Sequence, residues 1–183
     1  MGWELDNHWD LNVDQCVMIA APHTSNWDAL YARLGLKALG VNVRLTIKDS
    51  YMKLPFGPFV RAMGGIGIDR SVKQAGQERP SMVQLMSDLF KTHPKLVMLV
   101  TPEGTRAKQE QWKTGFYHVA MTAGVPIALA YMDYAKKKTG VGKMIYPTGN
   151  YEQDMAEIMA FYAEINAKHP EKFSVDQRYA NNK

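Results

Sequence analysis

The sequence is poor in cysteine and has no long apolar run. Its 183 residues include one cysteine, Cys16, which excludes an internal disulfide and favours a reducing compartment. No window approaches the roughly 20 apolar residues that a membrane-spanning helix needs. The first ten residues, MGWELDNHWD, are acidic where a secretory signal peptide would be apolar. We therefore expect a cytoplasmic chain that can touch lipid only from its surface.

The sequence also lacks the patterns of metal and nucleic-acid sites. No His-Glu-x-x-His motif is present, and four of the five histidines are scattered: His8, His93, His118 and His169. Zinc-finger spacing, an RNA-recognition signature and a helix-turn-helix are absent as well. We expect no metal and no nucleic-acid partner.

Positive charge is concentrated in the middle of the chain. The formal net charge is +4, and residues 44–113 contain 12 Lys or Arg against 6 Asp or Glu. Such a basic segment suggests an anionic partner such as phosphate, anionic lipid or nucleic acid, although a solvated basic face would have the same composition.

Apolar runs alternate with helical periodicity along the chain. Strands are predicted at 16–21, 41–47, 65–68 and 96–100, with helices at 26–40, 54–64, 80–92 and 115–124. A hairpin and an amphipathic helix follow within 126–168, and the polar stretch 71–79 is expected to be a loop. This order predicts one α/β domain over residues 1–183. Its largely parallel mixed sheet should have about six or seven strands, with helices on both faces.

Three polar clusters come directly after predicted strands. PHTSNWD follows 16–21, DR follows 65–68, and TPEGTR follows 96–100. Parallel strands place their carboxyl ends at one edge of a sheet, where ligands gather. The three clusters are therefore expected to share one site.

His23 and Asp28 in the first cluster allow two interpretations. Ser25 and Asp28 have the spacing of a helix capping box, which needs no chemistry from the carboxylate. Alternatively, His23 is a general base whose imidazolium the Asp28 carboxylate stabilises. Capping does not exclude catalysis, because a carboxylate has two oxygens. No serine or cysteine stands in an obvious nucleophile turn, so His23 would activate a substrate hydroxyl directly.

The other two clusters also have a structural alternative. Gly104 permits close approach of the backbone to a ligand, and Arg106 can bind a phosphate through two hydrogen bonds. However, Thr101 and Pro102 could simply begin a helix, and Asp69-Arg70 could be a structural ion pair.

Taken in order, the motifs resemble the glycerophosphate/lysophosphatidate (1-acylglycerol-3-phosphate) acyltransferase family. The resemblance covers roughly residues 16–135 and rests on four segments: HTSNWD (23–28), Lys48 with LPFGPFVRAMGGIGIDR (54–70), TPEGTR (101–106) and GVPI (124–127). Thr101 stands where the family usually has Phe, which leaves room for a head group other than glycerol phosphate.

The resemblance implies that His23 is the general base and Asp28 its partner. It further implies an acceptor- and phosphate-binding set made of Lys48, Arg70, Glu103, Gly104, Thr105 and Arg106, and an acyl channel formed with 125–127. The donor would be acyl-CoA or acyl carrier protein, and the acceptor a lysophospholipid-like molecule. No metal and no bound cofactor is implied.

Two other functions are compatible with the same residues. The dyad could act on water, as in an esterase or thioesterase, or the chain could bind anionic lipids without catalysis. In each case we expect peripheral contact with the cytoplasmic face of a membrane. The aromatic and basic stretch 51–61 has a composition that suits such an interface, although ordinary core packing is the alternative for many of its residues.

Overall fold

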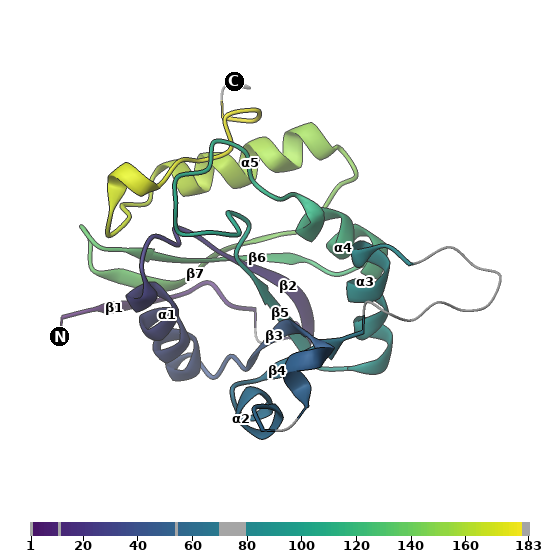
Figure 1. Cartoon of the computed structure of the whole chain (residues 1–183). Coiled ribbons are helices and arrows are strands. Elements are labelled where there is room, and N and C mark those ends of the chain that lie inside the picture. The colour runs from purple at the N-terminus through teal and green to yellow at the C-terminus, as the bar shows by residue number, and fades with distance from the viewer. Residues whose placement is uncertain (1, 11, 54, 70–79, 181–183) are drawn as a thin grey trace.

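A computed structural model describes residues 2–10, 12–53, 55–69 and 80–180. It contains a single seven-stranded sheet with helices on both faces (Figure 1). The strands are β1 (Glu4–Asn7), β2 (Gln15–Ala20), β3 (Val43–Lys48), β4 (Gly65–Ile68), β5 (Leu96–Val100), β6 (Ile127–Asp133) and β7 (Lys138–Ile145). The helices are α1 (Asn26–Ala38), α2 (Gly57–Ala62), α3 (Met82–Thr92), α4 (Gly115–Ala123) and α5 (Tyr151–Ala163), with 3₁₀ turns η1 (Asp49–Met52) and η2 (Pro170–Lys172).

The strand order is β1-β7-β6-β2-β5-β3-β4. The strands β6, β2, β5, β3 and β4 pair in parallel, whereas β7 pairs antiparallel with β6 and parallel with β1. The predicted single α/β domain with a largely parallel mixed sheet is confirmed. Strand β1 was not predicted, because four residues at the edge of a sheet have no clear alternation.

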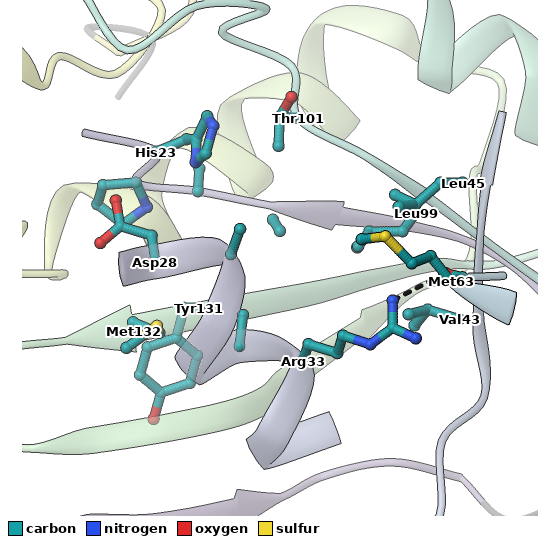
Figure 2. Close-up of a pocket in the computed structure, with 15 residues that line it drawn as sticks. His23, Asp28, Arg33, Val43, Leu45, Met63, Leu99, Thr101, Tyr131 and Met132 are labelled. Atoms are coloured by element: carbon teal, nitrogen blue, oxygen red, sulfur yellow. Dashed lines mark hydrogen bonds between the residues drawn. The ribbon is translucent and has the colours of Figure 1, made fainter. Parts of the chain in front are cut away.

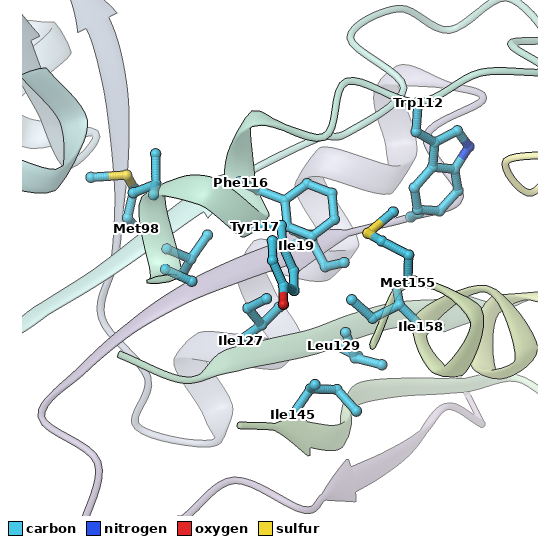
Figure 3. Packing of buried hydrophobic residues seen from close by; sticks show 14 of the residues in the cluster. Ile19, Met98, Trp112, Phe116, Tyr117, Ile127, Leu129, Ile145, Met155 and Ile158 are labelled. Carbon is cyan, nitrogen blue, oxygen red and sulfur yellow. The ribbon is translucent and has the colours of Figure 1, made fainter. Parts of the chain in front are cut away.

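Alternate side chains of β2 point to opposite faces of the sheet and divide the core into two parts. Val17 and Ile19 face α3, α4 and α5, where Phe116, Ile158 and Tyr162 complete the larger cluster (Figure 3). Cys16 and Met18 face the opposite way, toward Leu36 of α1. Because β2 is buried on both faces, its sequence is continuously apolar rather than alternating.

Helix α5 ends earlier than its sequence pattern suggests. The predicted amphipathic face is buried, but the helix stops at Ala163. The side-chain amide of Asn166 donates to Asp133 Oδ2 over 3.0 Å, and the Asn166 carbonyl accepts the N–H of Tyr134 over 2.9 Å. These bonds hold the following segment against the end of β6, so the chain leaves the helical path.

The most unexpected surface is the outer side of α1. Trp27, Leu30 and Leu34 have the spacing of a core-facing stripe, yet Trp27 is 52% exposed and the two leucines are exposed as well. Two small residues of α1, Ala29 and Ala32, line a cavity. An apolar face is thus left uncovered by the described residues, and a cavity lies beneath the helix.

Candidate active site

The candidate base lies where β2 ends. The strand is buried up to Ala20, and the chain then passes through Ala21 and Pro22 to His23, whose side chain is half-buried. Helix α1 begins three residues later at Asn26. His23 therefore stands at the carboxyl edge of the parallel strands, as the sequence predicts.

Asp28 accepts hydrogen bonds on both of its oxygens. Oδ2 accepts the backbone N–H groups of Thr24 and Ser25 over 2.7 and 2.8 Å. Oδ1 accepts the hydroxyls of Ser25 and Tyr134 over 2.8 and 2.7 Å. The carboxylate itself is buried. Its bond to the N–H of Ser25 has the geometry of the predicted capping box, which holds the first turn of α1 in place.

The charges around His23 act on its imidazole in opposite directions. Burial lowers the pKa of His23 below 6.5, the nearby Asp28 carboxylate raises it, and the Arg106 guanidinium lowers it. Burial dominates, so the ring is neutral at physiological pH and able to accept a proton. Among the described residues no hydrogen bond joins the imidazole to Asp28. Such catalytic bonds are often long without substrate and shorten in the reactive complex.

Glu103 lies in the turn after β5 and is only 3% exposed. Its Oε1 accepts the backbone N–H of His23 over 2.7 Å. Burial, opposed by that hydrogen bond and reinforced by the Asp28 charge, raises the pKa of Glu103 to about 7. The segments after β2 and β5 are thus joined through this one carboxyl group.

The next three residues are exposed, in contrast to Glu103. Gly104 has φ +68°, and its N–H donates to the Thr101 carbonyl over 3.0 Å, so TPEGTR forms a turn and not the start of a helix. Thr105 and Arg106 follow on the surface, close enough for the guanidinium to act on the pKa of His23. A cation beside the candidate base can bind an anionic substrate group.

Two further predicted site residues are less well defined. Lys48 ends β3 and is exposed, but it does not line the cavity described next. Arg70 lies outside the described residues, as does the predicted loop 71–79.

A cavity of about 270 Å³ opens beside His23 under helix α1 (Figure 2). Its walls are mostly apolar and come from α1, β3, β5 and β6; they include Ala29, Ala32, Leu45, Leu99 and Met132. At the far end, Arg33 of α1 donates to the Met63 carbonyl over 2.8 Å (Figure 2). His23 and Asp28 also line this space, which therefore joins the candidate base to an apolar compartment.

The expected channel residues are elsewhere. Val125 and Ile127 belong to the core cluster on the opposite face of the sheet and are absent from the walls of this cavity. Tyr134 was not predicted as a site residue, yet its hydroxyl reaches Asp28 from just beyond β6. A lone tyrosine after a strand has no recognisable signal. The Ala29 and Ala32 pair could have suggested a space under α1, because small residues cannot fill it.

The described residues contain neither a candidate metal site nor a candidate membrane span. No group of three or more His, Cys, Asp or Glu in that part of the chain could hold a metal ion. None of its helices has both the length and the apolarity required to cross a bilayer.

Comparisons with known proteins identify the family and the fold of the chain. The family model described as Acyltransferase matches residues 5–133, from the second residue of β1 to the end of β6. A solved structure of 1-acyl-sn-glycerophosphate (LPA) acyltransferase, PlsC, from Thermotoga maritima has a similar fold, with a TM-score of 0.52 at 16% identity. The match covers 86% of this chain and 67% of that one. A comparison with curated proteins found no match.

Proposed function

Because this chain belongs to the acyltransferase family, we propose that it moves a fatty acyl group from a thioester to a hydroxyl of a lysophospholipid-type acceptor, with His23 as the general base. One observation carries the proposal: His23 lines an apolar cavity, and both the buried Asp28 carboxylate and the exposed Arg106 guanidinium are close enough to act on the pKa of its imidazole. In this proposal, one edge of the sheet carries the base His23, its electrostatic partner Asp28 and Arg106, the cation for the acceptor's anionic group.

In this mechanism the acceptor hydroxyl oxygen attacks the thioester carbonyl carbon. One ring nitrogen of His23 takes the hydroxyl proton as the new C–O bond forms, and the Asp28 charge stabilises the imidazolium. The C–S bond then breaks, and the proton passes from His23 to the departing thiolate. The products are an ester and a free thiol, and no metal or bound cofactor takes part.

Each substrate group has a corresponding part of the site. The acyl chain would enter the apolar cavity under α1, where burial stabilises it by about 0.8 kcal/mol per methylene. Arg106 would bind the anionic group of the acceptor, flanked by Gly104 and Thr105, and Lys48 and Arg70 are proposed as further cations for that group. The donor would be acyl-CoA or acyl carrier protein. The similar structure from Thermotoga maritima is that of a 1-acyl-sn-glycerophosphate acyltransferase, so this acceptor class is tested first.

Membrane contact would be made by the face that carries α1 and α2, which lie on the same side of the sheet (Figure 1). Exposed apolar side chains gather on these elements and on η1: Trp27, Leu30, Leu34, Tyr51, Phe56, Phe59 and Met63. A hollow of about 440 Å³ beside them is lined by four cations, Arg33, Lys37, Arg44 and Lys95. Apolar side chains with a basic rim suit the surface of an anionic bilayer. The chain would thus act peripherally, at the cytoplasmic face.

A thiol-release assay with palmitoyl-CoA tests the proposed reaction. Release that depends on added lysophosphatidic acid supports transfer, release without acceptor indicates hydrolysis, and no release indicates a non-catalytic lipid binder. His23→Ala should abolish acceptor-dependent release, with folding checked by circular dichroism. Full activity of this variant would overturn the proposal.

Arg106→Ala provides a second test, with Lys108→Ala as a matched control. Both cations are exposed, but Lys108 pairs with Glu110 over 3.7 Å. We expect Arg106→Ala to raise the acceptor KM and Lys108→Ala to leave it unchanged. An unaltered KM in Arg106→Ala would remove this residue from the acceptor site.

A further inference from the structure

Glu103 is held deep in the fold by the turn that carries it. The Thr101 carbonyl accepts the N–H of Gly104 over 3.0 Å, and the Pro102 carbonyl accepts the N–H of Lys113 over 2.8 Å. These bonds turn the chain so that Glu103 points inward while Gly104 stays at the surface. Its carboxyl group is thus in a different environment from the exposed residues that follow it.

The two carboxyl oxygens of Glu103 have different surroundings. Oε1 accepts the backbone N–H of His23 over 2.7 Å. Oε2 is the one buried side-chain oxygen in the described part of the chain without a hydrogen-bond partner. The Asp28 carboxylate and the buried Tyr162 hydroxyl are close enough to interact electrostatically with Glu103. Tyr162 itself donates to the Ile19 and Ala130 carbonyls.

A contribution to stability alone does not account for a carboxyl group in this position. A buried oxygen without a partner destabilises the folded state, typically by about 1–3 kcal/mol. The neighbouring Asp28 charge repels a second carboxylate, and among the described residues no cation forms an ion pair with Glu103. The Glu103 side chain does accept one short hydrogen bond, and the donor is the backbone N–H of His23, the candidate base.

We propose that Glu103 is a positioning residue that holds His23 in its reactive place through the backbone N–H, and that it does not bind the acceptor directly. The proposal rests on the assignment of His23 as the base. Glu103 comes from the end of β5 and His23 from the segment after β2, so the bond ties the base to a rigid neighbouring strand. Without this hydrogen bond, residues 21–24 lose the contact that connects the backbone of His23 to the turn after β5.

The positioning role predicts a particular kinetic signature. Misplacement of a catalytic group by about 1 Å can lower the rate of reaction on the order of 100-fold. Loss of the tether should therefore lower kcat and leave the acceptor KM unchanged, because Arg106 remains in place. A residue that binds the acceptor would show the opposite pattern, with a raised KM.

Two substitutions separate the hydrogen bond from the charge. Glu103→Gln keeps an oxygen that can accept the N–H of His23, whereas Glu103→Met has a similar length without an oxygen. We expect kcat of Glu103→Gln to stay within about threefold of the wild type and that of Glu103→Met to fall by about 10- to 100-fold. The acceptor KM should change in neither variant.

Two spectroscopic readouts complete the experiment on the full-length protein. In Glu103→Met, the backbone amide of His23 should exchange its hydrogen faster, and the imidazole pKa measured by NMR should rise toward 6.5 as the ring becomes more solvated. Asp154→Ala is the control, because Asp154 is also a buried carboxylate that accepts backbone and side-chain donors, from Thr148 and Tyr117. It should destabilise the fold without altering either readout.

Three results would overturn the positioning role. The first is that Glu103→Met leaves both kcat and the amide exchange of His23 unchanged. The second is that Glu103→Met raises the acceptor KM and leaves kcat unchanged. The third is that Glu103→Gln loses as much kcat as Glu103→Met does. Failure of the proposed function can be told apart from failure of the positioning role. An active His23→Ala variant would refute His23 as the base. Hydrogen exchange and the imidazole pKa would still report whether Glu103 holds His23.

Discussion

The hydroxyl of Tyr134 donates a 2.7 Å hydrogen bond to Asp28 Oδ1. The bond joins the residue after β6 to the first turn of α1 and comes from just beyond the region that the family model matches. Burial and the Asp28 charge raise the pKa of Tyr134, so its hydroxyl keeps its proton and remains a donor. This bond fixes the orientation of the Asp28 side chain at the start of α1.

Tyr134→Phe should weaken this arrangement. Oδ1 of Asp28 would keep only the Ser25 hydroxyl as a donor, so we expect the free energy of unfolding to fall by about 1 kcal/mol and kcat to decrease. Urea unfolding and the thiol-release assay measure the two effects. Tyr146→Phe is the control, because Tyr146 is 60% exposed. Equal kcat values for the two variants would exclude a contribution of Tyr134 to the site.

The dependence of the rate on pH should follow the His23 imidazole. Because burial lowers its pKa below 6.5, kcat/KM should be flat near neutral pH and decline only below 6.5. Asp28 raises this pKa and Arg106 lowers it. The acid limb should therefore move to lower pH in Asp28→Asn and to higher pH in Arg106→Ala. Shifts in the same direction would show that another group controls this limb.

Glu103 should make stability depend on pH. Its pKa is raised from 4.5 to about 7, so the folded state binds the proton more tightly than the unfolded state. The resulting stability is fully present below pH 4.5 and is lost as the pH rises through 7. The glutamine of Glu103→Gln does not titrate in this range. The free energy of unfolding of the variant, minus that of the wild type, should therefore increase between pH 4.5 and 7, by at most about 3 kcal/mol. Urea unfolding at pH 5 and pH 8 tests this, and an equal difference at both would contradict it.

The cavity under α1 should set the accepted acyl-chain length. Ala32→Phe would place a ring in the cavity, so long-chain thioesters should lose affinity while short-chain thioesters are still used. If the ring excludes two methylenes of the acyl chain from the cavity, about 1.6 kcal/mol of binding is lost. The KM for long-chain thioesters should then rise roughly tenfold. Ala38→Phe, on the exposed side of the same helix, is the control. An unchanged chain-length profile would place the acyl chain elsewhere.

The exposed rings at the start of α2 and within it, Phe56 and Phe59, should contribute to membrane binding. A Phe56→Ser/Phe59→Ser double variant removes two exposed rings and should cosediment less with phosphatidylglycerol vesicles than the wild type does. Tyr146→Ser removes an exposed ring outside this face and should behave like the wild type. Phosphatidylcholine vesicles should bind less protein because they lack net charge. Wild-type protein that remains in solution with anionic vesicles would refute the proposed contact.

Local patterns were sufficient for most of the secondary structure. Residues 16–20 and 96–100 are apolar runs of strand length, and both form central strands of the sheet. Periodicity likewise located α3 and α5, because their apolar residues recur every three or four positions and face the core. The outward orientation of Trp27 in α1 did not follow from its spacing, since periodicity identifies an apolar face but not what covers it.

By itself, the sequence determined the order of strands and helices from β2 onward, the capping box that Ser25 and Asp28 form at the start of α1, and the placement of His23 and the TPEGTR segment after parallel strands. These features depend on neighbours in the chain or on a general property of parallel sheets. Only the tertiary structure decided that Glu103 is buried against the N–H of His23, that Tyr134 reaches Asp28, and that a cavity lies under α1. The physical reason is that these contacts join residues about 80 and 106 positions apart, and their geometry arises only when the sheet brings the strand ends together.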